Sequence, residues 1–132
     1  MVNFIHVAVG VIVNDRDEVL VAYRPANKAQ GGLWEFPGGK KEKNETIESA
    51  LRREFFEEIG IHLKSYFPIL KIEHVYEEYA LILDVWMITE YTKIAVGAEG
   101  QIIEWRSIES LNFEDFPDAN KKIISFLKLR GV

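Results

Sequence analysis

The sequence predicts an α/β fold in which a mixed β-sheet lies between α-helices. Short runs rich in valine and isoleucine, bounded by turn residues, favour buried strands. Two segments instead carry apolar residues every three to four positions, which favours amphipathic helices. Strands interleaved with two helices favour a sheet that is covered on both faces.

The N-terminal part of the chain reads as strands joined by turns and a loop. Residues 5–13 are dense in valine and predict a buried strand, residues 14–17 a turn, and residues 19–23 the returning strand. Residues 25–32 hold a proline and two glycines and predict a loop. A short extended piece follows over residues 33–36.

The central helix has clear start and stop signals. The Pro-Gly-Gly run at residues 37–39 predicts a turn before it. Thr46 suits the N-cap, and Gly60 suits the left-handed residue that ends a helix. Together they predict a helix over residues 47–59.

The second half of the chain predicts three strands and a terminal helix. Residues 69–76 and 79–89 look like paired strands, with two glutamates at the turn between them. Residues 102–105 read as another short strand. Residues 120–129 carry apolar residues at helical spacing and predict a terminal amphipathic helix.

Acidic residues of the central helix lie on its apolar side. At about 100° per residue, Glu54 and Glu58 project into the apolar stripe, with Glu57 beside them. Like charges four residues apart repel, and burying an unpaired carboxylate is costly. This pattern predicts a positive partner, and clustered carboxylates suit a hard divalent cation, Mg²⁺ or Mn²⁺. The alternative is a solvated acidic face.

Length and composition predict one compact domain over residues 1–132. The sequence has no cysteine, which excludes disulfides, thiolate zinc sites and a cysteine nucleophile. The apolar segment 4–13 lacks a basic leader and a cleavage site, and no segment has the length of a membrane span. We therefore expect a cytoplasmic protein without a membrane partner. We also expect a monomer. The three histidines show no metal-ligand spacing.

The formal net charge of −5 argues against a protein that binds a nucleic-acid polymer through basic patches. It does not exclude a small phosphate-bearing molecule. An acidic site binds such an anion when metal ions bridge the two sets of negative charges.

The segment from residue 39 to residue 61 reads GKKEKNETIESALRREFFEEIGI and resembles the signature of the Nudix hydrolases. The matching positions are Gly39, Glu45, Arg53, Glu54, Phe55, Glu57, Glu58, Gly60 and Ile61. The resemblance implies a helix–sheet–helix sandwich. It also implies cleavage of a nucleoside diphosphate linked to another group, with a divalent metal ion.

Further segments resemble the MutT branch of this family. They are AVGVIV at residues 8–13, LWEFPGGK at 33–40, EGQ at 99–101, EW at 104–105 and DFPDAN at 115–120. This branch hydrolyses 8-oxo-dGTP, an oxidised and mutagenic nucleotide, to the monophosphate and pyrophosphate. The resemblance therefore implies that this chain removes oxidised nucleotides from the DNA precursor pool.

The resemblance also implies metal ligands and a general base. Glu54, Glu57 and Glu58 would hold the metal ions together with the backbone carbonyl of Gly38, and Glu99 would be a further ligand. Water activated by metal would attack the β-phosphorus. Glu54 is the first choice for the general base and Glu99 the second.

Arg53 would orient the neighbouring glutamates through ion pairs, with Glu45 as its partner. A purely structural role for Arg53 is the alternative.

The expected substrate-binding residues lie outside the signature. Arg24 matches an arginine at the phosphate end of the nucleotide, and a guanidinium fork suits that task. Phe36 and Asn120 match residues around the purine base, although Asn120 also suits a helix N-cap. Tyr79 departs from the branch, which has arginine near the base pocket, and the loop 27–32 also differs.

Two other functions fit the same sequence. The first is a Nudix pyrophosphohydrolase acting on CTP or related pyrimidine nucleotides, which the segments 24–26 and 32–36 also suit. The second is a nucleotide-binding module without turnover. The complete set of glutamates argues against that module.

Overall fold

The computed structural model describes residues 3–27 and 31–130. The strands are β1 (Phe4–Val11), β2 (Glu18–Tyr23), β3 (Trp34–Glu35), β4 (Gly38–Lys40), β5 (His62–Val75), β6 (Ala80–Thr92) and β7 (Ile103–Ser107). The helices are α1 (Ile47–Ile59) and α2 (Lys121–Arg130), and the short 3₁₀ helices η1 (Ile108–Ser110), η2 (Phe113–Asp115) and η3 (Asp118–Asn120) precede α2. No helix in this part of the chain is long and apolar enough to span a bilayer.

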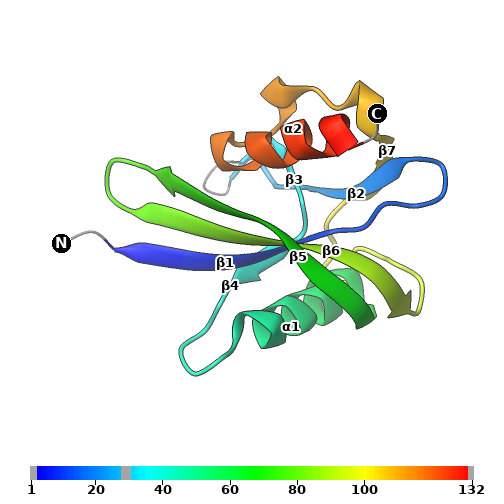
Figure 1. Ribbon diagram of the computed structural model, residues 1–132, viewed down its shortest axis with the longest axis horizontal. Helices are drawn as coiled ribbons and strands as arrows, with labels where there is room; N and C mark the ends of the chain where they lie inside the picture. Colours follow the sequence, from blue (N-terminus) through cyan, green and yellow to red (C-terminus); the bar gives the residue numbers. More distant parts are fainter. Residues whose placement is uncertain (1–2, 28–30, 131–132) are drawn as a thin grey trace.

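The strands form two sheets, which α1 and α2 cover from opposite sides (Figure 1). The larger sheet has the order β4-β1-β6-β5 and is mixed, because β1 runs parallel to β6 while the other pairs are antiparallel. The smaller sheet has the order β3-β2-β7. The predicted α/β fold with both faces covered is confirmed.

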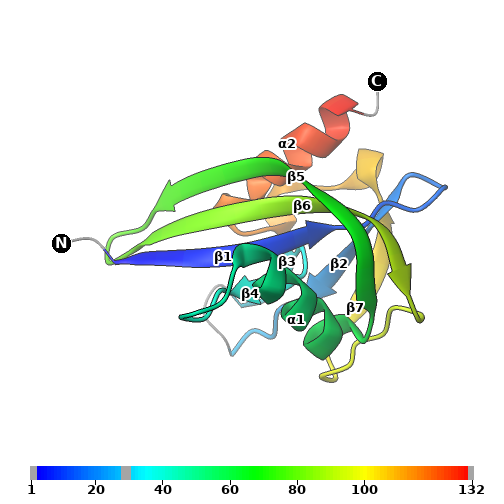
Figure 2. The ribbon, with the colours of Figure 1, turned by 60° about the horizontal axis from the view of Figure 1, so that its bottom comes forward.

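Two apolar cores fill the space on either side of β1. Because side chains of a strand point alternately to opposite faces, Ala8 joins the core beneath α1, whereas Val9 and Val11 join the core beneath α2. Phe55 fills the first core and Phe116 the second, and both side chains are fully buried. Figure 2 shows α1 lying across the sheet on the side opposite α2.

The prediction of a turn at residues 37–39 is wrong. Gly38 begins strand β4, which pairs with β1 so that Gly38 lies opposite Val9. A Cβ atom added at Gly38, whose φ is 153°, would lie 2.0 Å from the carbonyl oxygen of Ala8. The glycine is therefore needed for this pairing, and Pro-Gly-Gly reads as a turn only when the partner strand is unknown.

Strand β5 begins seven residues before the predicted start at Ile69. Its first half lacks the alternation that marks a strand, and it holds Pro68 and several irregularities of register. Both features are typical of an edge strand, where proline is tolerated. The predicted loop 25–32 includes residues 28–30, which lie outside the described residues.

Candidate active site

Helix α1 begins and ends at the residues that its sequence predicts. The Thr46 hydroxyl accepts a hydrogen bond from the Ser49 amide at 3.1 Å, and Gly60 adopts the left-handed conformation with a φ of 74°. Leu51 and Phe55 are fully buried against the sheet. These caps and contacts fix the rotation of α1 and therefore the direction of its glutamates.

Arg53 is the centre of an ion-pair network on α1. Its guanidinium donates to both carboxylate oxygens of Glu45 at 2.7 and 3.0 Å, to Glu54 at 2.8 Å and to Glu57 at 3.1 Å. It also donates to the carbonyl of Lys40 at 3.0 Å, which ties α1 to β4. Hydrogen bonding to Arg53 lowers the pKa of Glu45 to about 2. The expected pairing of Arg53 with Glu45 is confirmed.

Glu58 carries a buried carboxylate oxygen that lacks a partner. Its Oε2 atom makes no hydrogen bond within the described chain. Burial raises the pKa of Glu58 to about 9, and a hydrogen bond and charge repulsion from Glu54 contribute to the increase. Glu54 itself lies against β4, since a Cβ atom added at Gly39 would meet its carboxylate at 2.3 Å. Two carboxylates thus face each other with too little positive charge between them.

The residues present fit a hard divalent cation. The donors are carboxylate oxygens, and a cation would supply both the missing partner of Glu58 and the charge that its ionised form requires. In the described ranges, no three potential ligand side chains already converge on one point. Glu57 is turned toward Arg53, so full ligation would require it to change partners.

The first cavity, of about 410 Å³, lies between β1, the β5–β6 hairpin and η3. Its wall includes the predicted substrate-binding residues Arg24, Phe36, Tyr79 and Asn120, and also Gly38. The structure therefore brings together four residues that are far apart in the sequence. Its exposed surface is mainly apolar, which suits a planar ring.

A second cavity, of about 290 Å³, lies next to the acidic end of α1. Glu58 and Glu99 line it, together with Gln101. Arg24 and Glu35 line both cavities. The two cavities are therefore neighbours that share part of one wall.

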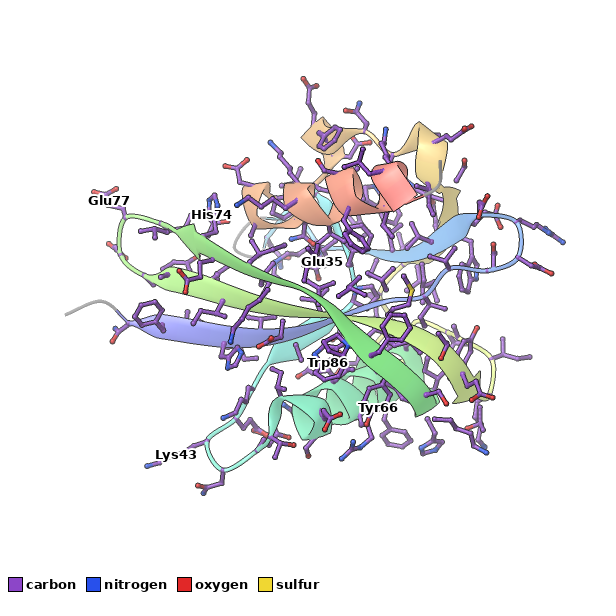
Figure 3. All side chains as sticks on the ribbon, in the orientation of Figure 1. Glu35, Lys43, Tyr66, His74, Glu77 and Trp86 are labelled. Atoms are coloured by element: carbon purple, nitrogen blue, oxygen red, sulfur yellow. The ribbon has the colours of Figure 1, made fainter. Side chains whose placement is uncertain are left out.

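Glu35 is a site residue that the sequence analysis missed. Its carboxylate pairs with Arg24 at 3.5 Å. Burial raises the pKa of Glu35, while the charge of Arg24 opposes the increase. In the view of Figure 3, Glu35 lies between the large sheet and α2, and its side chain is partly buried. An acidic residue between two aromatic residues was the available signal.

The side-chain oxygen of Asn120 makes a hydrogen bond in the wall of the first cavity. This oxygen accepts a hydrogen bond from the Phe36 amide at 3.3 Å. Asn120 is the last residue of η3, and its side-chain oxygen bonds to Phe36, which lies between β3 and β4. The structure therefore does not show the alternative role as a helix N-cap. The Phe36 ring is buried and stacks on Phe116 with their centroids 5.3 Å apart, so it supports the wall from behind.

Tyr79 lies at the turn of the β5–β6 hairpin, where the carbonyl of Tyr79 accepts a hydrogen bond from Tyr76 at 2.8 Å. The two rings pack with centroids 5.1 Å apart, and Tyr76 also contacts His74. Burial raises the pKa of Tyr76. An aromatic wall therefore stands where the MutT branch has an arginine. Tyr76 is a second lining residue that the sequence analysis missed.

The histidines lie away from the acidic cavity. His6 pairs with Asp84 on the neighbouring strand, His62 packs on Phe56, and His74 packs on Tyr76. None of the three lines either of the two cavities described above.

Glu58 predicts a dependence of stability on pH in the metal-free protein. Because its pKa is raised in the folded state, its contribution to stability is complete below pH 4.5 and is lost as the pH rises toward 9. We expect Glu58→Gln to remove this loss. The Tm of the variant relative to that of the wild type should therefore increase between about pH 5 and about pH 8.5. Thermal unfolding in EDTA across this pH range measures the difference between the two Tm values.

The matched control is Glu48→Gln, an exposed glutamate in the first turn of the same helix. Its Tm should stay at a nearly constant distance from that of the wild type. If Tm changed with pH in the same way in Glu58→Gln and in the wild type, the raised pKa of Glu58 would be contradicted. Added Mg²⁺ should stabilise the wild type more than Glu58→Gln.

The fold and the acidic helix define the class of protein. The chain belongs to the NUDIX family, since the model of the NUDIX domain matches residues 8–126. It is therefore a Nudix hydrolase, and enzymes of this family generally depend on divalent metal ions.

Within the family, the similarity extends over almost the whole chain. The 8-oxo-dGTP diphosphatase of Escherichia coli (strain K12) is 37% identical over 94% of this chain and 96% of its own length. The CTP pyrophosphohydrolase of the same organism is 31% identical over 93% and 92%. A solved structure from work on MutT of Aliivibrio salmonicida and Vibrio cholerae gives a TM-score of 0.82 at 33% identity, covering 97% of this chain and 99% of that one.

Proposed function

We propose that this chain, as a single-domain cytoplasmic monomer, hydrolyses 8-oxo-dGTP to 8-oxo-dGMP and pyrophosphate. Mg²⁺ is the proposed metal ion, and Mn²⁺ suits the same oxygen donors. The observation that carries the proposal is the pair of neighbouring cavities whose walls share Arg24 and Glu35. A base fits the apolar cavity, and a triphosphate reaching past Arg24 arrives at the glutamates.

The proposed metal ligands are Glu54, Glu57, Glu58, Glu99 and the Gly38 carbonyl. Their support is the buried, unpartnered oxygen of Glu58 and the mutual repulsion of the carboxylates. When bound, divalent ions polarise phosphoryl oxygens and lower the pKa of the attacking water.

Glu54 is the proposed general base for attack on the β-phosphorus, with Glu99 as the second choice. The support for Glu54 is its fixed position, since Arg53 holds one of its oxygens at 2.8 Å and β4 lies against its carboxylate. The water proton passes to this carboxylate, the bond to the bridging oxygen of the α-phosphate breaks, and the monophosphate leaves. Arg53 orients Glu54 and Glu57 in this scheme without touching the substrate.

Arg24 would bind the phosphate chain. Its place in the walls of both cavities supports this role. Glu35, paired with Arg24, would hold the direction of the guanidinium. A guanidinium offers several donors in a fixed plane, so it can hold a carboxylate and a phosphate together.

Asn120 would read the oxidised base. A carbonyl oxygen has two lone pairs, so its bond to Phe36 leaves one that can accept from N7–H of 8-oxoguanine. The amide N–H can donate to O6 of the same base. Guanine has a bare N7 acceptor instead, which the amide oxygen would repel. Cytosine has an amino donor where O6 would lie.

We expect Asn120→Ala to raise KM for 8-oxo-dGTP by about tenfold and KM for dGTP much less. The lost bond to N7–H exists only with the oxidised base, whereas the lost bond to Phe36 affects both nucleotides. Steady-state kinetics with both nucleotides measures the difference. Equal effects on the two KM values would leave Asn120 with a structural role only.

The second candidate is hydrolysis of CTP or a related pyrimidine nucleotide. The similarity to the CTP pyrophosphohydrolase favours it, as does the absence of the branch arginine at Tyr79. A comparison of kcat/KM for 8-oxo-dGTP, dGTP, CTP and 5-methyl-dCTP in Mg²⁺ tests both candidates. The oxidised purine should lead by at least about tenfold.

A further inference from the structure

The loop between β6 and β7 closes the C-terminal end of α1. The last carbonyls of a helix have no partner within the helix. Here the Ile59 carbonyl accepts from the Val96 amide at 3.0 Å, and the Glu58 carbonyl accepts from the Ala98 amide at 2.9 Å. The backbone of this loop therefore satisfies both carbonyls.

Gln101 adds a second connection between this loop and α1. Its amide nitrogen donates to the Glu58 carbonyl at 2.7 Å, and its amide oxygen accepts from the Glu99 backbone at 3.0 Å. An amide side chain has one donating and one accepting end, and both are used here. One side chain thus joins the backbones of Glu58 and Glu99.

This connection is more than a helix cap. The Glu58 carbonyl already has a backbone donor in Ala98, so the end of α1 would be satisfied without Gln101. What Gln101 alone supplies is the bond to Glu99, whose side chain is exposed and lies on a loop. Glu58, Glu99 and Gln101 all line the second cavity.

We propose that Gln101 is a positioning residue that holds Glu99 at a fixed distance from Glu58, so that both carboxylates reach the same metal ions. This inference rests on the proposed function, because that function assigns both glutamates as ligands. A ligand on an exposed loop loses conformational entropy when it binds, and Gln101 reduces this cost by ordering the loop beforehand.

The test measures Mn²⁺ binding to the metal-free protein without nucleotide, by titration calorimetry. Gln101→Met keeps the length of the side chain and removes both hydrogen bonds, and we expect about tenfold weaker binding. Asn112→Ala is the control, because it removes a side-chain-to-backbone bond on η2, outside both cavities. It should leave Mn²⁺ affinity unchanged.

A double variant separates positioning from general damage. If Gln101 acts through Glu99, adding Gln101→Met to Glu99→Gln should weaken Mn²⁺ binding no further. Hydrogen exchange of the Glu99 amide should also be faster in Gln101→Met than in the wild type, because that amide loses its acceptor.

Two results would overturn the inference. Unchanged Mn²⁺ affinity in Gln101→Met would do so, as would the same tenfold loss in the Glu99→Gln background. If Glu99→Gln itself leaves Mn²⁺ affinity unchanged, the proposed ligand role of Glu99 fails and the inference fails with it. Substrate preference does not enter this test, so a different nucleotide would leave it intact.

Discussion

Replacing Glu57 by glutamine is expected to abolish turnover and leave the fold intact. Its side chain is 49% exposed and its contact is with Arg53, so the loss of its charge costs little stability. Loss of a metal ligand removes several kcal/mol of transition-state stabilisation. Each 1.36 kcal/mol is a factor of about ten, so we expect kcat/KM to fall by about a thousandfold or more.

Glu48→Gln is the matched control, since it is the same substitution on the exposed side of α1. Its kcat/KM should equal that of the wild type, and circular dichroism should confirm that both variants fold. Unchanged turnover in Glu57→Gln would contradict the assignment of the metal ligands.

Replacing Gly38 by alanine is expected to destabilise the protein by about 3 kcal/mol. The new methyl group would lie 2.0 Å from the Ala8 carbonyl oxygen, so β4 must move away from β1. The φ of 153° adds backbone strain to this clash. Because β4 also lies against Glu54, the movement should disturb the site, and urea unfolding of the metal-free protein measures the loss.

Gly32→Ala separates the clash from the backbone strain. Gly32 also has a positive φ, 79°, but an added Cβ atom there meets no atom within 4 Å. Its cost should be the strain alone, about 1–2 kcal/mol. Equal losses of stability in the two variants would show that the clash with Ala8 is relieved at no cost.

Features that are local in sequence could be predicted. The ends of α1 follow from Thr46, Gly60 and the apolar period, and the structure confirms them to the residue. The placement of Glu54 and Glu58 near the apolar stripe follows from the same period. The pairing of Arg53 with Glu45 follows from the signature resemblance, and the structure contains it.

Features that depend on distant pairing could not be predicted. Strand β4 exists because β1 lies beside it, and no signal within Pro-Gly-Gly reveals that neighbour. The bond from Phe36 to Asn120 joins residues 84 positions apart. The two cavities that share Arg24 and Glu35 likewise appear only when distant segments of the chain are brought together.

The resemblance reached the right family and gave testable site residues, but the base pocket is where this chain departs from the branch. Tyr79 packs on Tyr76 and forms an aromatic wall there. The acidic helix is common to the whole family, so it indicates the reaction and leaves the base open. Our proposal assigns the choice of nucleotide to Asn120, which the kinetics of Asn120→Ala test.

The most direct measurement is therefore kcat/KM in Mg²⁺ for 8-oxo-dGTP, dGTP, CTP and 5-methyl-dCTP, with the products identified. We predict that 8-oxo-dGTP exceeds each of the others by at least about tenfold and yields 8-oxo-dGMP and pyrophosphate. A higher value for CTP or 5-methyl-dCTP would contradict the proposed substrate and favour the pyrimidine nucleotide.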